Sequence, residues 1–188
     1  MSTRAEANAI SDLLQPEDQL RAEGFGARRT LVTDGELADY DVVHFATHGL
    51  LSSERPELSG IALSLVDETG RSENGFLRLG DIERLDLPVR LVVLSACDTA
   101  LGKEVPGEGV VGLVSGFLTA GADGVVASYW KVEDEATAEL MRSFYTGLLS
   151  DRLPTPTALR RAQRAMLERH RWDSPYFFGA FEFHGSWR

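Results

Sequence analysis

The chain is predicted to fold as an α/β protein: a three-layer α/β/α sandwich with a central, mostly parallel sheet. Two apolar, β-branched runs, residues 41–49 and 91–99, lack the polar alternation of a half-exposed strand. They therefore indicate strands that are buried on both faces. A third such run, residues 125–129, follows an apolar helical segment at residues 110–120. This alternation of strand and helix is typical of a parallel sheet between helical layers.

The first half of the chain adds a helix and a hairpin to this sheet. Thr3 and Glu6 have the spacing of a capping box, and apolar residues follow at helical spacing, which predicts a first helix. Residues 60–66 and 75–79 flank a polar turn. They predict a β-hairpin inserted between the first two long strands.

The second half supplies two long helices and a last strand. Asp134 is predicted to cap a helix over residues 135–149, because its carboxylate can accept from first-turn N–H groups. Thr155 followed by Pro156 predicts the N-cap and first residue of another helix. The aromatic run at residues 177–184 predicts an edge strand.

The composition predicts one cytoplasmic domain over residues 1–188, with no membrane segment and no direct nucleic-acid contact. With 43% hydrophobic residues, 188 residues can bury a substantial core. A single cysteine cannot form an internal disulfide, and the first residues lack the apolar segment of a secretory signal. No apolar run approaches the roughly 20 residues that span a bilayer. The net charge of -10 would repel phosphate backbones.

Two chemically reactive side chains stand at the ends of the two long strands. His48, followed by Gly49, ends the first strand, and Cys97, the only cysteine, ends the second. Ligands collect at the carboxyl ends of parallel strands, and an imidazole beside a thiol is the arrangement of nucleophilic catalysis. Their separation of 49 residues (97 − 48) is close to the spacing of about 50 residues between the histidine and cysteine of caspases. The alternative is that Cys97 is a small buried hydrophobe.

His44 is predicted to be a hydrogen-bonded core histidine. It shares strand parity with His48, but four residues at about 3.3 Å each place the two roughly 13 Å apart. A His-x-x-x-His metal pair belongs on a helix, whereas this context predicts a strand. No metal and no cofactor are expected. A redox or flavodoxin-like domain is disfavoured, because no phosphate-binding Gly-x-Gly-x-x-Gly is found at a strand-to-helix turn.

Four blocks in order resemble the CHAT family of caspase-like peptidase domains, which commonly accompany TPR repeats and are related to separases and caspases. The blocks are residues 44–49, 92–99, 107–113 and 124–138, within a match from about Thr30 to Trp187. The resemblance implies a caspase-like fold. That fold normally begins with a central strand, which nothing before Thr3 could supply, so the chain is expected to be a fragment of a longer protein.

The resemblance also implies a cysteine endopeptidase that acts on a protein substrate. Cys97 would be the nucleophile and His48 the general base and then acid, with the amides of Gly49 and Cys97 binding the oxyanion. A TPR or other sensor region, in the same chain or a partner, is the implied associate. The alternative is a weakly active or inactive CHAT-type module that only binds other proteins.

The expected substrate contacts come from two places in the chain. Ser95 stands two residues before Cys97, at the position that helps line the S1 pocket of caspases, and is too short to pair with a charged P1 side chain. The loop after the third strand resembles a substrate-recognition stretch of separases. Lys131 there replaces an acid of separases, which argues against an arginine P1, and Trp130 fits a pocket wall and a core position equally well. The predicted substrate-binding residues are Ser95, Trp130, Lys131, Glu133 and Asp134.

Overall fold

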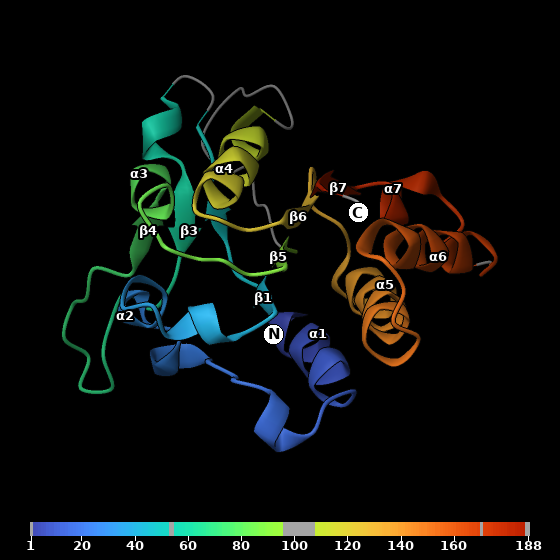
Figure 1. Ribbon diagram of the computed structural model, residues 1–188, viewed down its shortest axis with the longest axis horizontal. Coiled ribbons are helices and arrows are strands. Elements are labelled where there is room, and N and C mark those ends of the chain that lie inside the picture. The colour runs from blue at the N-terminus through green and yellow to red at the C-terminus, as the bar shows by residue number, and fades with distance from the viewer. Residues whose placement is uncertain (1, 53–54, 96–107, 170, 187–188) are drawn as a thin grey trace.

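The computed structural model describes residues 2–52, 55–95, 108–169 and 171–186 (Figure 1). Its central sheet has the strand order β1-β5-β6-β7. The strands are β1 (Val42–Phe45), β5 (Leu91–Leu94), β6 (Gly124–Ser128) and β7 (Phe181–Gly185). The first three run parallel and β7 is antiparallel to β6. The predicted mostly parallel sheet is therefore confirmed. The edge strand predicted at residues 177–184 begins only at Phe181, because Phe177 and Phe178 belong to the short helix α7 (Pro175–Phe178).

The parallel register brings three strand ends to one edge of the sheet. Phe45 of β1 is paired with Leu94 of β5, and Leu94 is paired with Ala127 of β6. All residues of β5 and β6 are buried, as predicted. In β1 only every second residue is buried. The other two residues, Val42 and His44, are partly buried, and Val42 packs against the buried residues on its own face, so β1 is covered on both faces but less completely than β5 and β6.

Helices cover both faces of the central sheet, as the predicted three-layer arrangement requires. On one face, α4 (Glu108–Thr119) lies with α2 (Arg29–Thr33) and α3 (Leu79–Ile82) against alternate strand residues that include Val125; we call this core the α4 cluster. On the other face, α5 (Asp134–Tyr145) and α6 (Thr155–Leu167) pack against residues that include Val126; this is the α5 cluster. Figure 1 shows α4 on one side of the strands and α5 with α6 on the other.

The inserted hairpin forms a second, smaller sheet. Its strands are β2 (Gly49–Leu50), β3 (Gly60–Ala62) and β4 (Phe76–Arg78), all antiparallel. The predicted hairpin is confirmed, and β2, directly after His48, joins it as a third strand. The remaining elements are α1 (Ser2–Ser11), α7 (Pro175–Phe178), a π-helical turn η5 (Thr146–Ser150) and the 3-10 segments η1 (Pro16–Asp18), η2 (Gly24–Gly26), η3 (Glu36–Asp39) and η4 (Pro56–Leu58).

Three predicted helix caps are wrong. Thr3 lies inside α1, and the Glu6 carboxylate accepts a hydrogen bond from Ser95 across the core instead of reaching back along the helix. Asp134 is the first residue of α5, and the N-cap Glu133 makes no side-chain cap. Likewise α6 begins at Thr155 and its N-cap makes no side-chain hydrogen bond. Within the described ranges, no helix combines the length and apolar character needed to cross a membrane.

Candidate functional site

His48 and Gly49 lie where the central sheet passes into the hairpin sheet. His48 is three residues beyond Phe45, the last residue of β1, and its side chain is exposed. The His48 carbonyl accepts a hydrogen bond from the Ala62 amide at 2.9 Å. Gly49 is buried and pairs with Ile61 of β3. The hairpin therefore fixes the backbone on which the predicted general base stands.

Cys97 lies outside the described residues, so its relation to His48 stays a prediction. The described strands nevertheless constrain the chain that leads to it. Phe45 and Leu94 are paired, and Ser95 donates its amide to the Phe45 carbonyl at 3.2 Å. His48 and Cys97 each follow their paired strand residue by three positions (48 − 45 and 97 − 94).

Ser95 is buried, and its hydroxyl is held inside the protein. The residue is 7% exposed, and Oγ donates to Glu6 Oε2 at 3.0 Å. Ser95 Oγ also lies 3.2 Å from His44 Nε2. A contribution of Ser95 to a substrate pocket stays a prediction, and its hydroxyl already has partners within the fold.

His44 is a hydrogen-bonded histidine of the protein interior, as predicted. Nδ1 lies 2.9 Å from the Tyr145 hydroxyl, and Nε2 lies 3.2 Å from Glu6 Oε1. Burial, and then the nearby charge of Glu6, raise the pKa of the Tyr145 hydroxyl above its ordinary value. Sequence reasoning missed both partners. The sequence pattern assigns Glu6 to a capping box, and Tyr145 lies 101 residues from His44, a separation that no local pattern can bridge.

The loop after β6 is held from one side by α7. The Trp130 indole donates from Nε1 to the Tyr176 carbonyl at 2.9 Å, and the Tyr176 hydroxyl donates to the Lys131 carbonyl at 2.8 Å. Trp130 is partly buried against the α5 cluster, whereas Lys131, Glu133 and Asp134 are exposed. The loop thus presents charges of both signs beyond the strand edge that also bears the ends of β1 and β5.

Tyr176 is a structural residue of this loop that sequence reasoning missed. It lies in the four-residue helix α7, where the Ser174 hydroxyl accepts from the Tyr176 amide at 3.4 Å and Pro175 is the first helical residue. The Ser-Pro pair could have signalled this short helix. Its contact with Trp130 depends on the tertiary fold.

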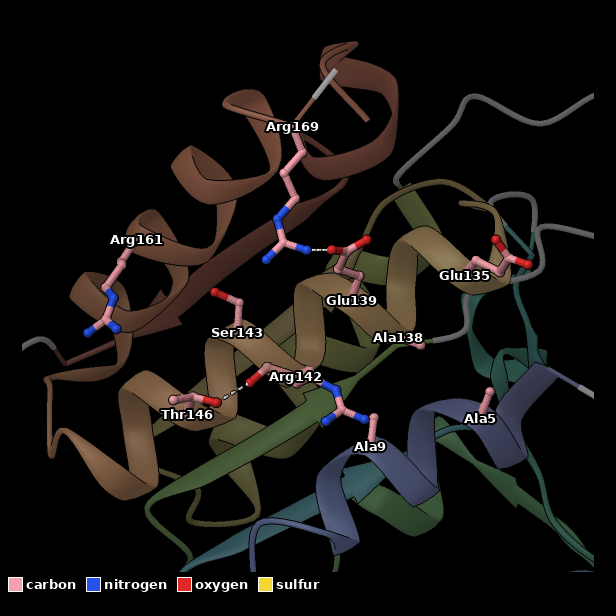
Figure 2. A pocket seen from close by; sticks show the side chains of 10 residues that line it. All are labelled: Ala5, Ala9, Glu135, Ala138, Glu139, Arg142, Ser143, Thr146, Arg161 and Arg169. Atoms are coloured by element: carbon pink, nitrogen blue, oxygen red, sulfur yellow. Dashed lines mark hydrogen bonds and ion pairs between the residues drawn. The ribbon is translucent and has the colours of Figure 1, made fainter. Parts of the chain in front are cut away.

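A cleft of about 570 Å³ lies elsewhere, between α1, α5 and α6 (Figure 2). Figure 2 shows Ala5 and Ala9 of α1 beside α5, with arginines along the walls. Arg161 forms an ion pair with Asp151, and Arg169 forms one with Glu139. No predicted site residue lines the cleft. It therefore contributes nothing to the predicted chemistry.

No described feature of the chain points to a metal or a nucleotide. No group of three or more His, Cys, Asp or Glu side chains within the described ranges is placed to hold a metal ion. Residues 107–112 do read Gly-x-Gly-x-x-Gly, but β5 ends at Leu94, 13 residues before Gly107 (107 − 94), so the motif is not on a tight strand-to-helix turn. A Cβ on Gly109 would meet Leu51 Cβ at 2.6 Å, so helix packing accounts for this glycine.

Comparison with known proteins gives two findings. A family model described as CHAT domain matches residues 1–186. Tetratricopeptide repeat protein 28 of Homo sapiens is 34% identical over 110 residues, and its counterpart in Mus musculus is 33% identical over 110 residues. Each match covers 58% of this chain and 4% of the relative. The chain therefore corresponds to a small part of these long repeat proteins.

Proposed function

Because the chain belongs to the CHAT domain family, we propose that it is a cysteine endopeptidase that cleaves a protein substrate through His48 and Cys97. The observation that carries the proposal is the β1–β5 register. Phe45 and Leu94 are partners on adjacent parallel strands, and the histidine and the cysteine each follow by the same number of residues. This equal spacing from paired strand residues supports a histidine–cysteine dyad beyond the shared edge of the sheet.

The proposed reaction is acyl transfer through a thioester. The His48 imidazole takes the Cys97 thiol proton, and the thiolate attacks the scissile carbonyl carbon. Amides of Gly49 and Cys97 donate to the oxyanion. His48 then gives its proton to the leaving amine as the C–N bond breaks. Water, deprotonated by His48, attacks the thioester, and the Cys97 sulfur leaves and regains a proton, releasing the acid product.

The described surroundings of His48 suit this role. An exposed imidazole can reach a bound peptide and exchange its proton with water. Gly49 has no side chain to obstruct a peptide backbone beside its amide. The hydrogen bond from the Ala62 amide to the His48 carbonyl limits movement of this backbone. A general base held in this way keeps its geometry while substrate binds.

The proposed substrate contacts lie at the same strand edge. Lys131, Glu133 and Asp134 are exposed and would contact polar groups of the substrate. For Ser95, the bound hydroxyl leaves only its small size and its backbone to shape a pocket. We place the domain in the cytoplasm beside a TPR or other sensor region, consistent with its single cysteine and its TPR-named relatives. The proposed substrate-binding residues are Ser95, Trp130, Lys131, Glu133 and Asp134.

A labelling and cleavage experiment tests the proposal. The chain is treated with a peptide-linked thiol-reactive electrophile and, separately, with a peptide library, both read by mass spectrometry. Cys97→Ala should abolish labelling and cleavage. His48→Gln should lower the cleavage rate by about 10²–10⁴-fold, the usual contribution of a general base to the rate.

His184→Gln is the matched control. His184 pairs with Val125 at the opposite end of β6, and the amide of Gln can still bond the Tyr129 hydroxyl that His184 contacts at 2.8 Å, so the substitution should leave cleavage unchanged. An unaltered cleavage rate in Cys97→Ala would refute the dyad. Folded chain that neither labels nor cleaves would favour the alternative of a CHAT-type protein-interaction module.

A further inference from the structure

A buried polar network lies beneath α1, on the α5 side of the sheet. Its four members come from four segments: Glu6 of α1, His44 of β1, Ser95 just after β5, and Tyr145 at the end of α5. Glu6, Ser95 and Tyr145 are 4%, 7% and 2% exposed. We call these four residues the Glu6 network. Apart from the proposed contribution of Ser95 to a substrate pocket, the cysteine chemistry proposed above uses none of their side chains.

With a neutral His44 ring, the contacts are consistent with the following direction of hydrogen bonding. The neutral Tyr145 hydroxyl donates to His44 Nδ1, which leaves the ring proton on Nε2, facing Ser95 Oγ. Ser95 Oγ in turn donates to Glu6 Oε2. The chain of donors thus starts at a phenol and ends on a carboxylate. The tautomer is assigned from these partners, since either ring nitrogen can carry the proton.

The Glu6 carboxylate is only partly satisfied by this arrangement. Oε1 lies 3.2 Å from His44 Nε2, yet it accepts no aligned hydrogen bond among the described residues. A buried carboxylate with a spare acceptor adds little stability compared with apolar packing of the same volume. The hydrogen bonds of the network do depend on geometry, because they form only when the four segments lie close together in this orientation. The network therefore contributes to the orientation of these segments more than to stability.

The network contacts the chain at the ends of β1 and β5, just before the segments that lead to His48 and Cys97. His44 is four residues before His48, and Ser95 is two residues before Cys97. We infer that Glu6, His44, Ser95 and Tyr145 are positioning residues that set the placement of His48 relative to Cys97 and couple α1 to the candidate active site. This inference rests on the proposed function, since it concerns the same dyad.

A measurable consequence follows for the thiol. An imidazolium beside Cys97 stabilises the thiolate and lowers the thiol pKa below the value of about 8.5 for a free cysteine. This attraction weakens as the two groups move apart. Loosening the network should therefore raise the thiol pKa and move thiolate formation to higher pH.

Alkylation by iodoacetamide reports this shift without any substrate, because Cys97 is the only cysteine of the chain. The alkylation rate is measured against pH for the full chain and for Tyr145→Phe and Glu6→Gln, which remove one hydroxyl and one charge. Each variant should move the midpoint upward by about half a unit to one unit. At pH 7 this corresponds to alkylation slowed by about three- to tenfold.

Two comparisons separate positioning from stability. Leu140→Val trims a fully buried side chain of α5 that belongs to the α5 cluster and carries no polar group, so its midpoint should equal that of wild type. Ser95→Thr keeps the hydroxyl and should retain the wild-type midpoint, whereas Ser95→Ala should move it upward. Thermal unfolding confirms that each variant is folded, and Tyr145→Phe provides the test if Glu6→Gln does not fold.

The outcomes distinguish this inference from the proposed function. If His48→Gln leaves the wild-type profile unchanged, there is no dyad, and the inference is overturned together with the peptidase. If His48→Gln raises the midpoint but folded Tyr145→Phe and Glu6→Gln match wild type, the network inference alone is overturned. A shift in Leu140→Val as large as that in Tyr145→Phe would also overturn it, since loss of stability would then explain both.

Discussion

Asp81 shows how a single carboxylate connects two short helices. It accepts from the Arg78 amide at 3.1 Å and from Arg84 at 2.9 Å, and it lies 3.2 Å from the guanidinium of Arg29 in α2. Burial raises the pKa of the Asp81 carboxyl, but the hydrogen bond from the Arg78 amide and the contact with Arg29 outweigh it. The net effect is a pKa below the ordinary value. The folded state thus favours the charged form.

Asp81→Asn should remove a pH-dependent part of the stability. A carboxyl whose pKa is lowered by folding stabilises the protein above its unfolded pKa of about 3.9, and this stability is lost as the pH falls through the folded pKa. The variant should therefore be less stable by about 1 kcal/mol at pH 7, and the difference should vanish in strong acid. Urea unfolding between pH 7 and pH 2 measures it.

The charge-matched control for Asp81 is Glu68→Gln, at an exposed position of the hairpin. Glu68 takes no part in the contacts of Asp81, so this variant should be as stable as wild type at pH 7. An Asp81→Asn difference that stays constant down to pH 2 would contradict the electrostatic explanation.

Among the secondary-structure elements, β3 depends on a glycine for its pairing with β4. A Cβ on Gly60 would lie 2.3 Å from the Leu77 carbonyl oxygen and 2.9 Å from Arg78 Cα. Both are backbone atoms of the partner strand, so no side-chain rotation can relieve the overlap. This close approach holds the hairpin sheet, which in turn fixes the backbone at His48.

Gly60→Ala should therefore lower the free energy of unfolding by about 1–3 kcal/mol, the usual cost of overpacking. Chemical denaturation followed by circular dichroism measures the loss. Gly26→Ala is the matched control, because a Cβ there meets no atom within 4 Å. It should be neutral or slightly stabilising. Equal effects of the two substitutions would show that the contact with β4 is unimportant.

At the scale of the whole molecule, one sheet separates two apolar cores. Val125 and Val126 are adjacent in β6 and both fully buried, yet the first belongs to the α4 cluster and the second to the α5 cluster. Because both cores pack on β6, unfolding of one core would disturb the packing of the other. We therefore propose that residues 1–188 form a single domain that unfolds cooperatively.

Val125→Ala and Val126→Ala should each destabilise both helical layers, by on the order of 2 kcal/mol. Amide hydrogen exchange under conditions that report global unfolding should speed up in α4 and in α5 for either variant, because two-state unfolding opens all elements together. Faster exchange confined to α4 in Val125→Ala, with α5 unchanged, would indicate two independent units.

Periodicity and apolar runs were enough to predict the central strands, the hairpin and the main helices, because these patterns reflect burial that repeats along the chain itself. They were less informative at the ends of elements. Thr3, Asp134 and Thr155 have the residue types of caps, but all three lie inside their helices. A side chain that could cap a helix can also bond to other groups, and the surrounding fold decides which of these hydrogen bonds forms.

Some features of the candidate site can likewise be predicted from the sequence, whereas others depend on tertiary packing. Residue order places His48 and Cys97 after matching strands, and this much follows from the chain alone. The register of Phe45 with Leu94, the burial of Glu6 against Ser95 and the anchoring of Trp130 by Tyr176 follow from packing of distant segments. A one-dimensional pattern carries the periodicity of each element but not the distances between elements, so the partners of a polar side chain emerge only when the layers come together.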